Sequence, residues 1–371
     1  MTVRPGTVTI IRGGRLLDAR AHRADPGDIL VTGDTISEIG PPGLTAPAGT
    51  VTVDARGMLL HPGLINAHTH AHGNLAKGMG DRWTLELLLT AAPWIIIRGC
   101  ADLAKEYGVG LHSHVAESKV QAIVGLQRYG KTLTAHLDDL GALGPHFTVA
   151  HGVWLDHDDM KRLGDHGASV AHNPGSNMRL GNGFGDMKAM LERRVSVGIG
   201  TDGANCSDNQ NVFEAMRLAS LVSKGQSPDV DRWVTTDEVV VAATEGSARA
   251  LGFAGKLGRL APGYLADIVF LDLKHPNWIP TNDPTNQLVH TENGGAVTHV
   301  MIGGRMIVEH RRLTTVDLEV LARDAEAARQ RLESVNAPAR ALYERLAPVV
   351  GRFCPGLAHV PYHAARYVGG R

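Results

Sequence analysis

The sequence has few of the features that support a disulfide scaffold or a membrane span. Its 371 residues include only three cysteines, Cys100, Cys206 and Cys354, too few and too scattered for a disulfide framework or a cysteine zinc site. No run approaches the ~18 apolar residues that cross a bilayer, and the first residues lack the apolar core of a secretion signal. We therefore expect a cytoplasmic protein with reduced thiols and no membrane partner.

An excess of charge of either sign is also missing. There are 37 Lys and Arg against 38 Asp and Glu, which makes the formal net charge −1. A protein whose main partner is a nucleic-acid backbone or an acidic membrane needs a basic excess, so neither partner is expected. Hydrophobic residues make up 43% and charged residues 20%, a balance that fits a folded globular protein and not a disordered chain.

Histidine, in contrast, is abundant. The 19 histidines outnumber the six Phe, six Tyr and five Trp taken together. Because histidine is the commonest metal ligand and the usual acid–base residue, the places of these side chains along the chain carry most of the information about function.

Short β-branched runs lie near both ends of the chain and are typical of strands. They cover residues 7–12, 29–39, 50–54, 266–273 and 297–308. Between them, apolar runs alternate with amphipathic helical runs, as in a parallel sheet covered by helices. We predict an α/β protein in which a small β-sandwich, built from both termini, accompanies a barrel of the TIM type.

The predicted division of the chain has four parts. Residues 1–60 and 258–312 form the two parts of the sandwich, 61–257 the β/α barrel domain and 313–371 a helical tail. Within the barrel domain we expect strands at 109–115, 147–151, 168–172 and 195–202, and helices at 158–165, 185–194 and 209–223.

Polar residues occur at the carboxyl ends of the expected barrel strands, the edge at which such barrels carry their active sites. His68 and His70 are two residues apart, so on a strand they share a face. Steps of 37, 21 and 30 residues separate the later polar strand ends from His114 to Asp202, close to a βα repeat of about 31 residues. An isolated pair of histidines is as often a hydrogen-bonded core pair, but this spacing favours a site for Zn²⁺ or a similar ion.

Five motifs, in this order, resemble the amidohydrolase superfamily. Within it they are similar to the chlorohydrolase and deaminase branch, which includes S-adenosylhomocysteine, guanine and 8-oxoguanine deaminases and s-triazine hydrolases. The motifs are PGLINAHTH (62–70), HSHVAES (112–118), AHGVWLD (150–156), HNPGSNMRLGNG (172–183) and GIGTDGANCSDNQNVFEAMR (198–217). Residues 255–272, GKLGRLAPGYLADIVFLD, resemble the return of the family's chain to its β-sandwich. The resemblance covers nearly the whole chain.

The resemblance implies a single divalent metal, zinc first and iron as the alternative. The implied ligands are His68, His70, His114 and Asp202. It also implies Glu117 as the proton shuttle and His151 as the group beside the activated water and the substrate, with Asp202 taking part in catalysis as well. The implied reaction is the deamination, or dechlorination, of an N-heteroaromatic small molecule. The metal lowers the pKa of a water molecule toward ~7, and the glutamate passes a proton to the ring and then to the leaving ammonia.

Weaker indications concern substrate contacts. The candidates are His172, Asn173, Asn177 and Trp83, with Ser176 beside them. The HNP segment is equally typical of a turn held by side-chain hydrogen bonds, and the tryptophan is equally a helix-packing residue. Cys206 is expected either to line the pocket or to be an inert buried thiol. His72 and His112 are expected to be structural or exposed.

The barrel is expected to be incomplete. Only 44 residues separate His70 from His114, whereas four βα steps of about 31 residues need about 124. A helix at 83–97 and a helical turn at 101–107 account for this stretch, so strands 2–4 are predicted to be largely absent. Strands 1 and 5 then become unpaired edges, which are prone to pair with another chain. A homo-oligomer is therefore one expected assembly of this chain.

Two alternatives to an active deaminase follow. One is a truncated homologue that has lost activity and keeps metal binding or self-association. The other is a two-metal cyclic amidase such as a hydantoinase or dihydroorotase, which needs a bridging carboxylated lysine on strand 4. The only lysines between His70 and His114 are Lys77 and Lys105, neither of them on an expected strand. The HxxE spacing from His114 to Glu117 also favours the one-metal deaminase.

Overall fold

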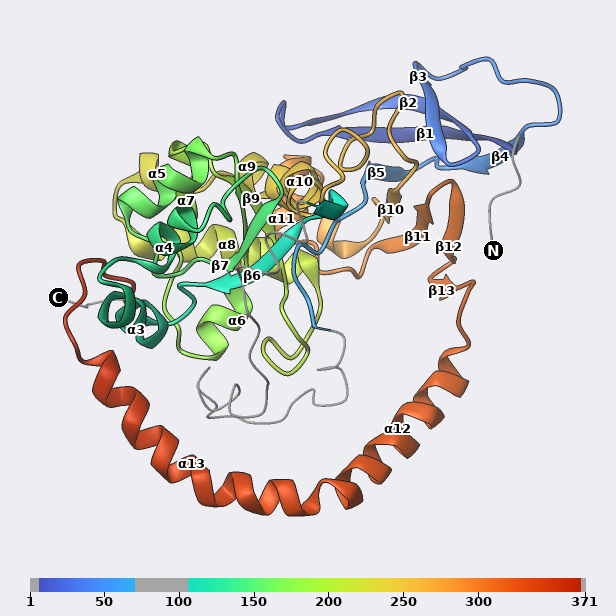
Figure 1. Cartoon of the computed structure of the whole chain (residues 1–371). Coiled ribbons are helices and arrows are strands. Elements are labelled where there is room, and N and C mark those ends of the chain that lie inside the picture. Colours follow the sequence, from blue (N-terminus) through green and yellow to red (C-terminus); the bar gives the residue numbers. More distant parts are fainter. Residues whose placement is uncertain (1–6, 71–105, 368–371) are drawn as a thin grey trace.

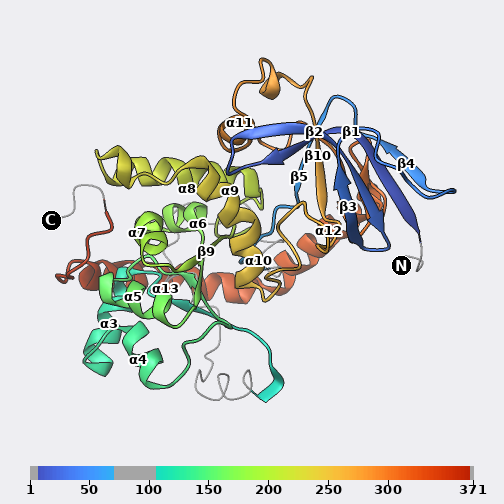
Figure 2. The same ribbon diagram turned by 90° about the horizontal axis from the view of Figure 1, so that it is seen from above.

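The computed structural model describes residues 7–70 and 106–367 (Figure 1). The helix expected at 83–97, most of the turn at 101–107, Trp83, His72 and the two lysines Lys77 and Lys105 lie outside the described residues. Among the described residues, no helix is both long and apolar enough to cross a membrane. The chain forms a nine-stranded sheet and a four-stranded parallel sheet. Figure 2 shows the larger sheet on one side of the molecule and most of the helices on the other.

Strands from both ends of the chain form the nine-stranded sheet. Its order is β13-β12-β11-β10-β5-β1-β2-β3, with β4 paired to β1. The two ends of the chain meet where β5 pairs antiparallel with β10. The strands are β1 (Val8–Asp18), β2 (Arg23–Thr32), β3 (Thr35–Gly40), β4 (Val51–Asp54), β5 (Met58–Pro62), β10 (Ile268–Asp272), β11 (Val297–Ile302), β12 (Arg305–Glu309) and β13 (Arg312–Leu313). The division into two packed layers and the four predicted domain boundaries stay predictions.

The two faces of this sheet pack into different hydrophobic cores, because successive side chains of its central strands point to alternate faces. On β5 and β10, Leu59 and Leu271 belong to the larger core that the sheet shares with the helices. Their neighbours Leu60 and Phe270 belong to a smaller core made by the sheet alone. Successive side chains of a strand point to opposite faces, so the apolar runs predicted as strands bury both faces of the sheet.

Two of the predicted strands are each a hairpin of two strands. Residues 29–39 turn at Gly33, whose φ is +63°, and Thr32 pairs with Thr35 across the turn. Residues 297–308 turn at Gly303 and Gly304, both with positive φ. Two-residue hairpin loops need positive φ, which glycine adopts without steric cost.

The second sheet is parallel and has the strand–helix alternation that the sequence predicts. Its four strands follow in chain order: β6 (Leu111–Val115), β7 (Phe147–His151), β8 (Ser169–His172) and β9 (Ser196–Ile199). The connections contain α3 (Lys119–Tyr129), α4 (Leu133–Asp139), α5 (His157–Asp165), α6 (Pro174–Arg179) and α7 (Met187–Glu192). After β9 come α8 (Val212–Gln226), η2 (Val230–Arg232), α9 (Thr236–Val241), the π-helical η3 (Ala242–Gly246) and α10 (Ser247–Ala250).

The segment with the first pair of histidines lies beside β9. The amide of Ala67 donates to the Ile199 carbonyl at 2.9 Å, and the amide of Asp202 donates to the His68 carbonyl at 2.9 Å. The approach is close because residue 200 is glycine: a Cβ there would lie 2.2 Å from Asn173 Oδ1 and 2.9 Å from His68 Cβ. Residues 63–70, where the first barrel strand was expected, are not a strand in the structure, but they lie directly beside β9.

The C-terminal part of the chain leaves the nine-stranded sheet and returns to the parallel one. After η4 (Pro276–Trp278), α11 (Pro284–His290) and the last strands, α12 (Leu318–Val335) and α13 (Ala337–Ala358) form an arc around the molecule (Figure 1). Beyond α13, Arg366 donates to the carbonyls of Val153 and Leu155, and its own carbonyl accepts from the Phe184 amide at 2.8 Å. Both helices lie within the predicted tail 313–371, and the final anchor on the loop after β7 was not predicted.

Candidate metal centre and active site

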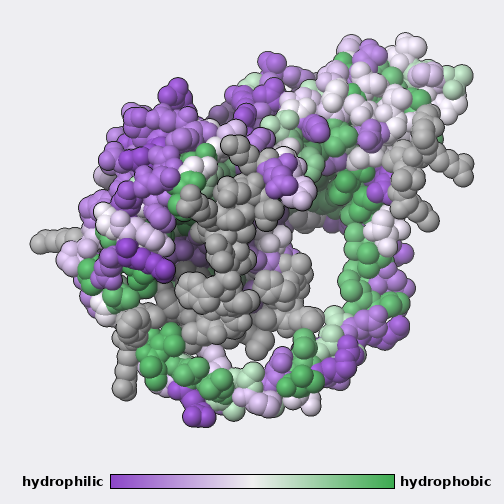
Figure 3. All heavy atoms as spheres, viewed as in Figure 1, coloured by the Kyte–Doolittle hydropathy of each residue, from purple (hydrophilic) through white to green (hydrophobic). Residues whose placement is uncertain are grey.

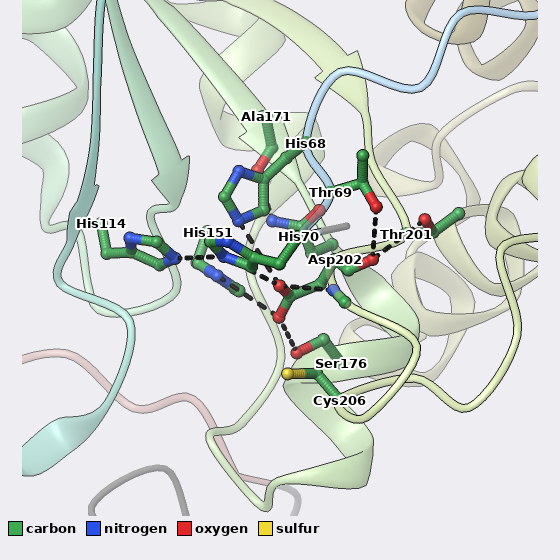
Figure 4. Close-up of polar contacts among 12 residues, drawn as sticks. His68, Thr69, His70, His114, His151, Ala171, Ser176, Thr201, Asp202 and Cys206 are labelled. Carbon is green, nitrogen blue, oxygen red and sulfur yellow. Dashed lines mark hydrogen bonds and ion pairs between the residues drawn. The ribbon is translucent and has the colours of Figure 1, made fainter. Parts of the chain in front are cut away.

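Four side chains from distant parts of the sequence converge at the carboxyl edge of the parallel sheet (Figure 4). One ligand atom from each lies within 4.8 Å of the others, and the four residues are His68, His70, His114 and Asp202. Asp202 Oδ1 is 3.5 Å from His68 Nε2 and 3.4 Å from His70 Nε2. His114 Nε2 from β6 approaches His70 Nε2 at 3.2 Å. The arc of strands thus curls far enough to bring β6 to the first histidine pair.

The backbone has an unusual conformation at two polar residues that follow or end the parallel strands. Asp202 has a φ of +60° and His151 a φ of +71°, both in the left-handed region. Non-glycine residues rarely adopt it, although Asp and His do so more readily than most. Such strain is found mostly at functional sites, where the surrounding contacts hold it. For Asp202 those contacts are the Gly203 amide, which donates to Oδ1 at 2.8 Å, and the Ser176 hydroxyl, which donates to Oδ2 at 2.6 Å.

The protonation states of these groups suit a cation. Burial raises the pKa of the Asp202 carboxyl, but the nearby His68 and His151 rings and the Ser176 hydroxyl together hold it well below its usual range. Desolvation of the His114 ring and the neighbouring imidazoles lower its pKa to about 2. At neutral pH the site therefore offers an ionised carboxylate and a neutral imidazole, the forms that bind metals.

One orphaned atom supports a metal in this place. His68 Nε2 is buried and has no hydrogen-bond partner among the described residues. A buried polar atom without a partner costs about 1–3 kcal/mol, so native structures rarely leave one. Three imidazoles and one carboxylate are a donor set that fits zinc or a similar divalent ion. The residues present therefore fit the single metal that the sequence predicts, while their role as its ligands stays a prediction.

The predicted proton shuttle lies beside this cluster. Glu117 is 2% exposed, and its Oε1 accepts from Asn182 Nδ2 at 3.1 Å. His151 is fully buried, with its Nε2 3.6 Å from Glu117 Oε1 and 3.8 Å from Asp202 Oδ2. Together with His114 they form a second group whose ligand atoms lie within 4.8 Å of one another. The carboxylate and the imidazole that the resemblance assigns to catalysis thus lie within reach of the cluster.

The ring of His151 is held in one orientation. Its Nδ1 lies 2.8 Å from Asn177 Oδ1, and because an amide oxygen only accepts, Nδ1 carries the proton. Burial lowers the pKa of the ring, so the neutral imidazole presents an unprotonated Nε2 to Glu117 and Asp202. That nitrogen has no hydrogen-bond partner among the described residues, which leaves it free to accept from a reacting group.

Asn173, Ser176 and Asn177, three of the predicted substrate contacts, have other partners in the structure. Asn177 holds His151, Ser176 holds Asp202, and Asn173 Nδ2 donates to the Ala171 carbonyl at 3.1 Å. His172 is 1% exposed, and burial lowers its pKa to about 4. The HNP segment and α6 therefore orient the groups of the centre. Substrate binding by His172, Asn173, Asn177 and Trp83 stays a prediction, and Trp83 lies outside the described residues.

Sequence reasoning passed over two residues near the centre. His112 stacks on His68 with ring centroids 4.9 Å apart, and its Nε2 lies 3.1 Å from His68 Nδ1. The sequence pattern could have indicated this residue, because His112 and His114 are two residues apart on one strand and therefore share a face. Asn182 had no such signal, because only folding brings the loop after α6 to Glu117. Cys206 is a buried free thiol whose pKa is raised by burial, in keeping with the inert alternative.

Comparison with known proteins identifies the family. The model of the amidohydrolase family matches residues 90–307. The chain therefore belongs to the amidohydrolase family, and the resemblance found in its motifs is confirmed.

Similar curated proteins are deaminases of adenosine derivatives. The 5-methylthioadenosine/S-adenosylhomocysteine deaminase of Syntrophobacter fumaroxidans is 29% identical over 84% of this chain and 95% of its own length. The enzyme of the same name from Thermococcus onnurineus is 39% identical over 59% of this chain and 51% of its own. The 5'-deoxyadenosine deaminase of Methanosarcina mazei is 34% identical over 62% and 53%. The chain thus matches about half the length of the latter two relatives.

Similar solved structures share the fold. An adenosine deaminase from Xanthomonas campestris with bound zinc has a TM-score of 0.81 at 22% identity, over 88% of this chain and 98% of that one. An atrazine chlorohydrolase from Arthrobacter aurescens complexed with zinc has a TM-score of 0.79 at 22% identity, over 86% and 100%. The α/β amidohydrolase fold predicted from the sequence is thereby confirmed.

Proposed function

We propose that the chain is a metal-dependent aminohydrolase that removes an amino group from an adenosine-type N-heteroaromatic compound. The observation that carries this proposal is the convergence of three imidazoles and one ionised carboxylate within 4.8 Å, next to the buried Glu117. Family membership and the deaminases among the relatives support the reaction type. A chloride leaving group is the variant suggested by the atrazine chlorohydrolase.

The proposed metal is one divalent ion, zinc or alternatively iron, held by His68, His70, His114 and Asp202. When bound, it supplies the Lewis acidity that makes a water molecule nucleophilic near neutral pH. Glu117, held by Asn182 at 3.1 Å, carries a proton to the ring nitrogen and then to the departing amine. His151 Nε2 accepts a hydrogen bond from the hydroxyl group added to the ring, because its other nitrogen is committed to Asn177.

We further propose that the barrel of this chain is incomplete. The alignment with the S. fumaroxidans relative runs over 419 positions, whereas 84% of 371 residues is about 312, so about 100 positions have no residue of this chain. Together with the 44-residue interval between His70 and His114, this favours a loss of internal βα units. The loops that those units carry would help choose the substrate, so its identity within the adenosine class stays open.

The loss of these units also favours a second candidate, a homologue that binds metal or self-associates without turnover. Metal analysis and an activity screen separate the two. We would measure zinc and iron per chain on the fraction that elutes as a defined species from a sizing column. Ammonia release would then be followed with adenosine derivatives, aminopurines, aminopyrimidines and triazines. About one metal per chain with turnover supports the deaminase. Metal without turnover, or no metal, supports the second candidate.

Three cysteines in 371 residues keep the cytoplasm as the expected compartment.

A further inference from the structure

The helix α12 exposes an apolar face that the rest of the described chain does not cover. None of its residues is buried. Leu318, Leu321, Leu332 and Val335 are 58%, 52%, 41% and 74% exposed. Both ends of the arc are nevertheless anchored, at β13 on one side and through Arg366 on the other. Figure 3 shows hydrophobic and hydrophilic residues side by side along it.

Six apolar positions of this helix follow a heptad spacing, while Val320, Ala322 and Ala327 lie outside it. The six recur in steps of three and four residues, at Leu318, Leu321, Ala325, Ala328, Leu332 and Val335, and the same spacing continues in α13 through Ala339, Leu342, Leu346 and Val349. A helix that packs on its own globule shows a wider stripe with a period of 3.6. A sustained 3.5-residue period is instead the signature of a coiled coil with another helix.

We propose that α12 is a self-association helix that packs antiparallel against α12 of a second copy of this chain. We call the heptad positions from Leu318 to Val335 the seam. It is self-complementary about its midpoint, which lies between Ala325 and Ala328. Leu318 then meets the partner's Val335, Leu321 meets the partner's Leu332, and Ala325 meets the partner's Ala328. Each contact is then made twice, as a two-fold interface requires, with large side chains facing large ones and alanines facing alanines.

The charges beside the seam favour this direction. Asp324 and Arg331 flank the seam in the sequence, and neither forms an ion pair with another described residue. Antiparallel packing sets Asp324 against the partner's Arg331 on both sides of the two-fold axis. A parallel pair would set Asp324 against the partner's Arg329. That side chain is already bound within its own helix, to Glu326 at 2.8 Å and Glu333 at 2.9 Å.

The seam is short, so the dimer should dissociate on dilution. The 18 residues of α12 span about 27 Å, which is about two and a half heptads. The helix α12 ends at its C-cap Asn336, and a new helix, α13, begins at Ala337, so a straight seam is limited to α12. This proposal does not depend on the proposed reaction.

Sedimentation of the full chain, from micromolar to submillimolar concentration, tests the proposal. The wild type should pass from monomer to dimer. The double variant Leu321→Glu/Leu332→Glu should raise the dissociation constant at least ~100-fold, since each buried anchor replaced costs about tenfold or more. The matched control Val320→Glu/Ala327→Glu adds the same charge on the same helix outside the seam and should stay close to wild type. A wild type that is monomeric throughout, or a seam variant that dimerises like the control, would overturn the proposal.

Charge exchange at Asp324 and Arg331 tests the direction without touching the apolar seam. Asp324→Arg and Arg331→Asp should each weaken the dimer, because like charges then face each other across the axis. The combination Asp324→Arg/Arg331→Asp should restore it, since opposite charges face each other again. A combined variant weaker than both single ones would exclude the antiparallel register. Far-UV circular dichroism and the wild-type metal content per chain confirm that each variant is folded.

Discussion

At the residue scale, Glu117 is the side chain whose replacement separates metal binding from turnover. Glu117→Gln keeps the volume of a side chain that is 2% exposed but cannot carry a proton. We expect metal content per chain to stay at the wild-type value and ammonia release to fall at least ~100-fold. Elemental analysis and a steady-state ammonia assay measure the two quantities. If the metal is lost as well, Glu117 is a ligand and the shuttle is another group.

Asp202 should behave in the opposite way. Asp202→Ala removes the carboxylate that lies 3.5 Å from His68 Nε2 and 3.4 Å from His70 Nε2, so both metal content and turnover should be lost. Asp231→Ala, in the surface helix η2, is the matched control and should change neither. Full activity in Asp202→Ala would remove this residue from the catalytic set.

At the element scale, the start of α5 carries a titratable group that stabilises the fold only while protonated. Burial raises the pKa of Asp159 from 3.8 to about 6, with the nearby Asp156 adding to the shift. Because the folded pKa lies above the ordinary one, its stabilising effect is complete below pH 4. It is lost as the pH rises through about 6, and the total is about 3 kcal/mol.

Asp159→Asn tests this dependence. The amide stays neutral and can still accept from the Thr132 hydroxyl, which Asp159 does at 2.5 Å. Denaturant unfolding between pH 4 and 7 should therefore show a smaller loss of unfolding free energy with rising pH than in the wild type. Equal pH slopes in the two proteins would show that Asp159 is already ionised in the folded state at pH 4.

The contact between β9 and the first histidine pair gives a second prediction at this scale. Gly200→Ala places a methyl group 2.2 Å from Asn173 Oδ1 and 2.9 Å from His68 Cβ, so the segment with His68 must move away. We expect lower metal content and a lower melting temperature. Gly225→Ala is the control, because a Cβ there meets nothing within 4 Å and alanine favours a helix. Metal content equal to that of the control would show that the segment adapts without loss.

The secondary elements also show how far sequence patterns extend. The parallel strands and their helices were predictable because apolar runs and amphipathic runs alternate. The hairpins at Gly33 and Gly303-Gly304 differ in this respect. The second has a pair of glycines at its turn, which is a stronger turn pattern than the first, where a single glycine followed by Asp34 interrupts the β-branched run only briefly. Turn chemistry of this kind is decided by one or two φ angles.

At the scale of the whole molecule, the metal should stabilise the fold. Its proposed ligands come from the segment before the barrel strands, from β6 and from the end of β9, so the cation ties three distant pieces together. An ion present at 100 times its dissociation constant adds about 2.7 kcal/mol. Treatment with a chelator should therefore lower the melting temperature by a few degrees, as calorimetry would measure, and added zinc should restore it. Glu117→Gln should respond like the wild type and Asp202→Ala should not respond at all.

The sequence by itself determined the polar groups of the candidate centre and their order along the chain. The two-residue spacing of the histidines and the order of the strand ends favour a metal site at one edge of the sheet. The assignment of His68, His70, His114 and Asp202 to that site is implied by the resemblance of the five motifs to the family. The sequence also contained the heptads of α12, since coiled-coil spacing is a local property.

Only the tertiary structure decided how these pieces meet. It brought His112 onto His68, turned Asn177 and Ser176 toward His151 and Asp202, placed Asn182 beside Glu117 and anchored the last residues on the loop after β7. The physical reason is that these contacts join elements far apart in the sequence. Their distances depend on the curl of the sheet and the packing of α6, which no local pattern encodes.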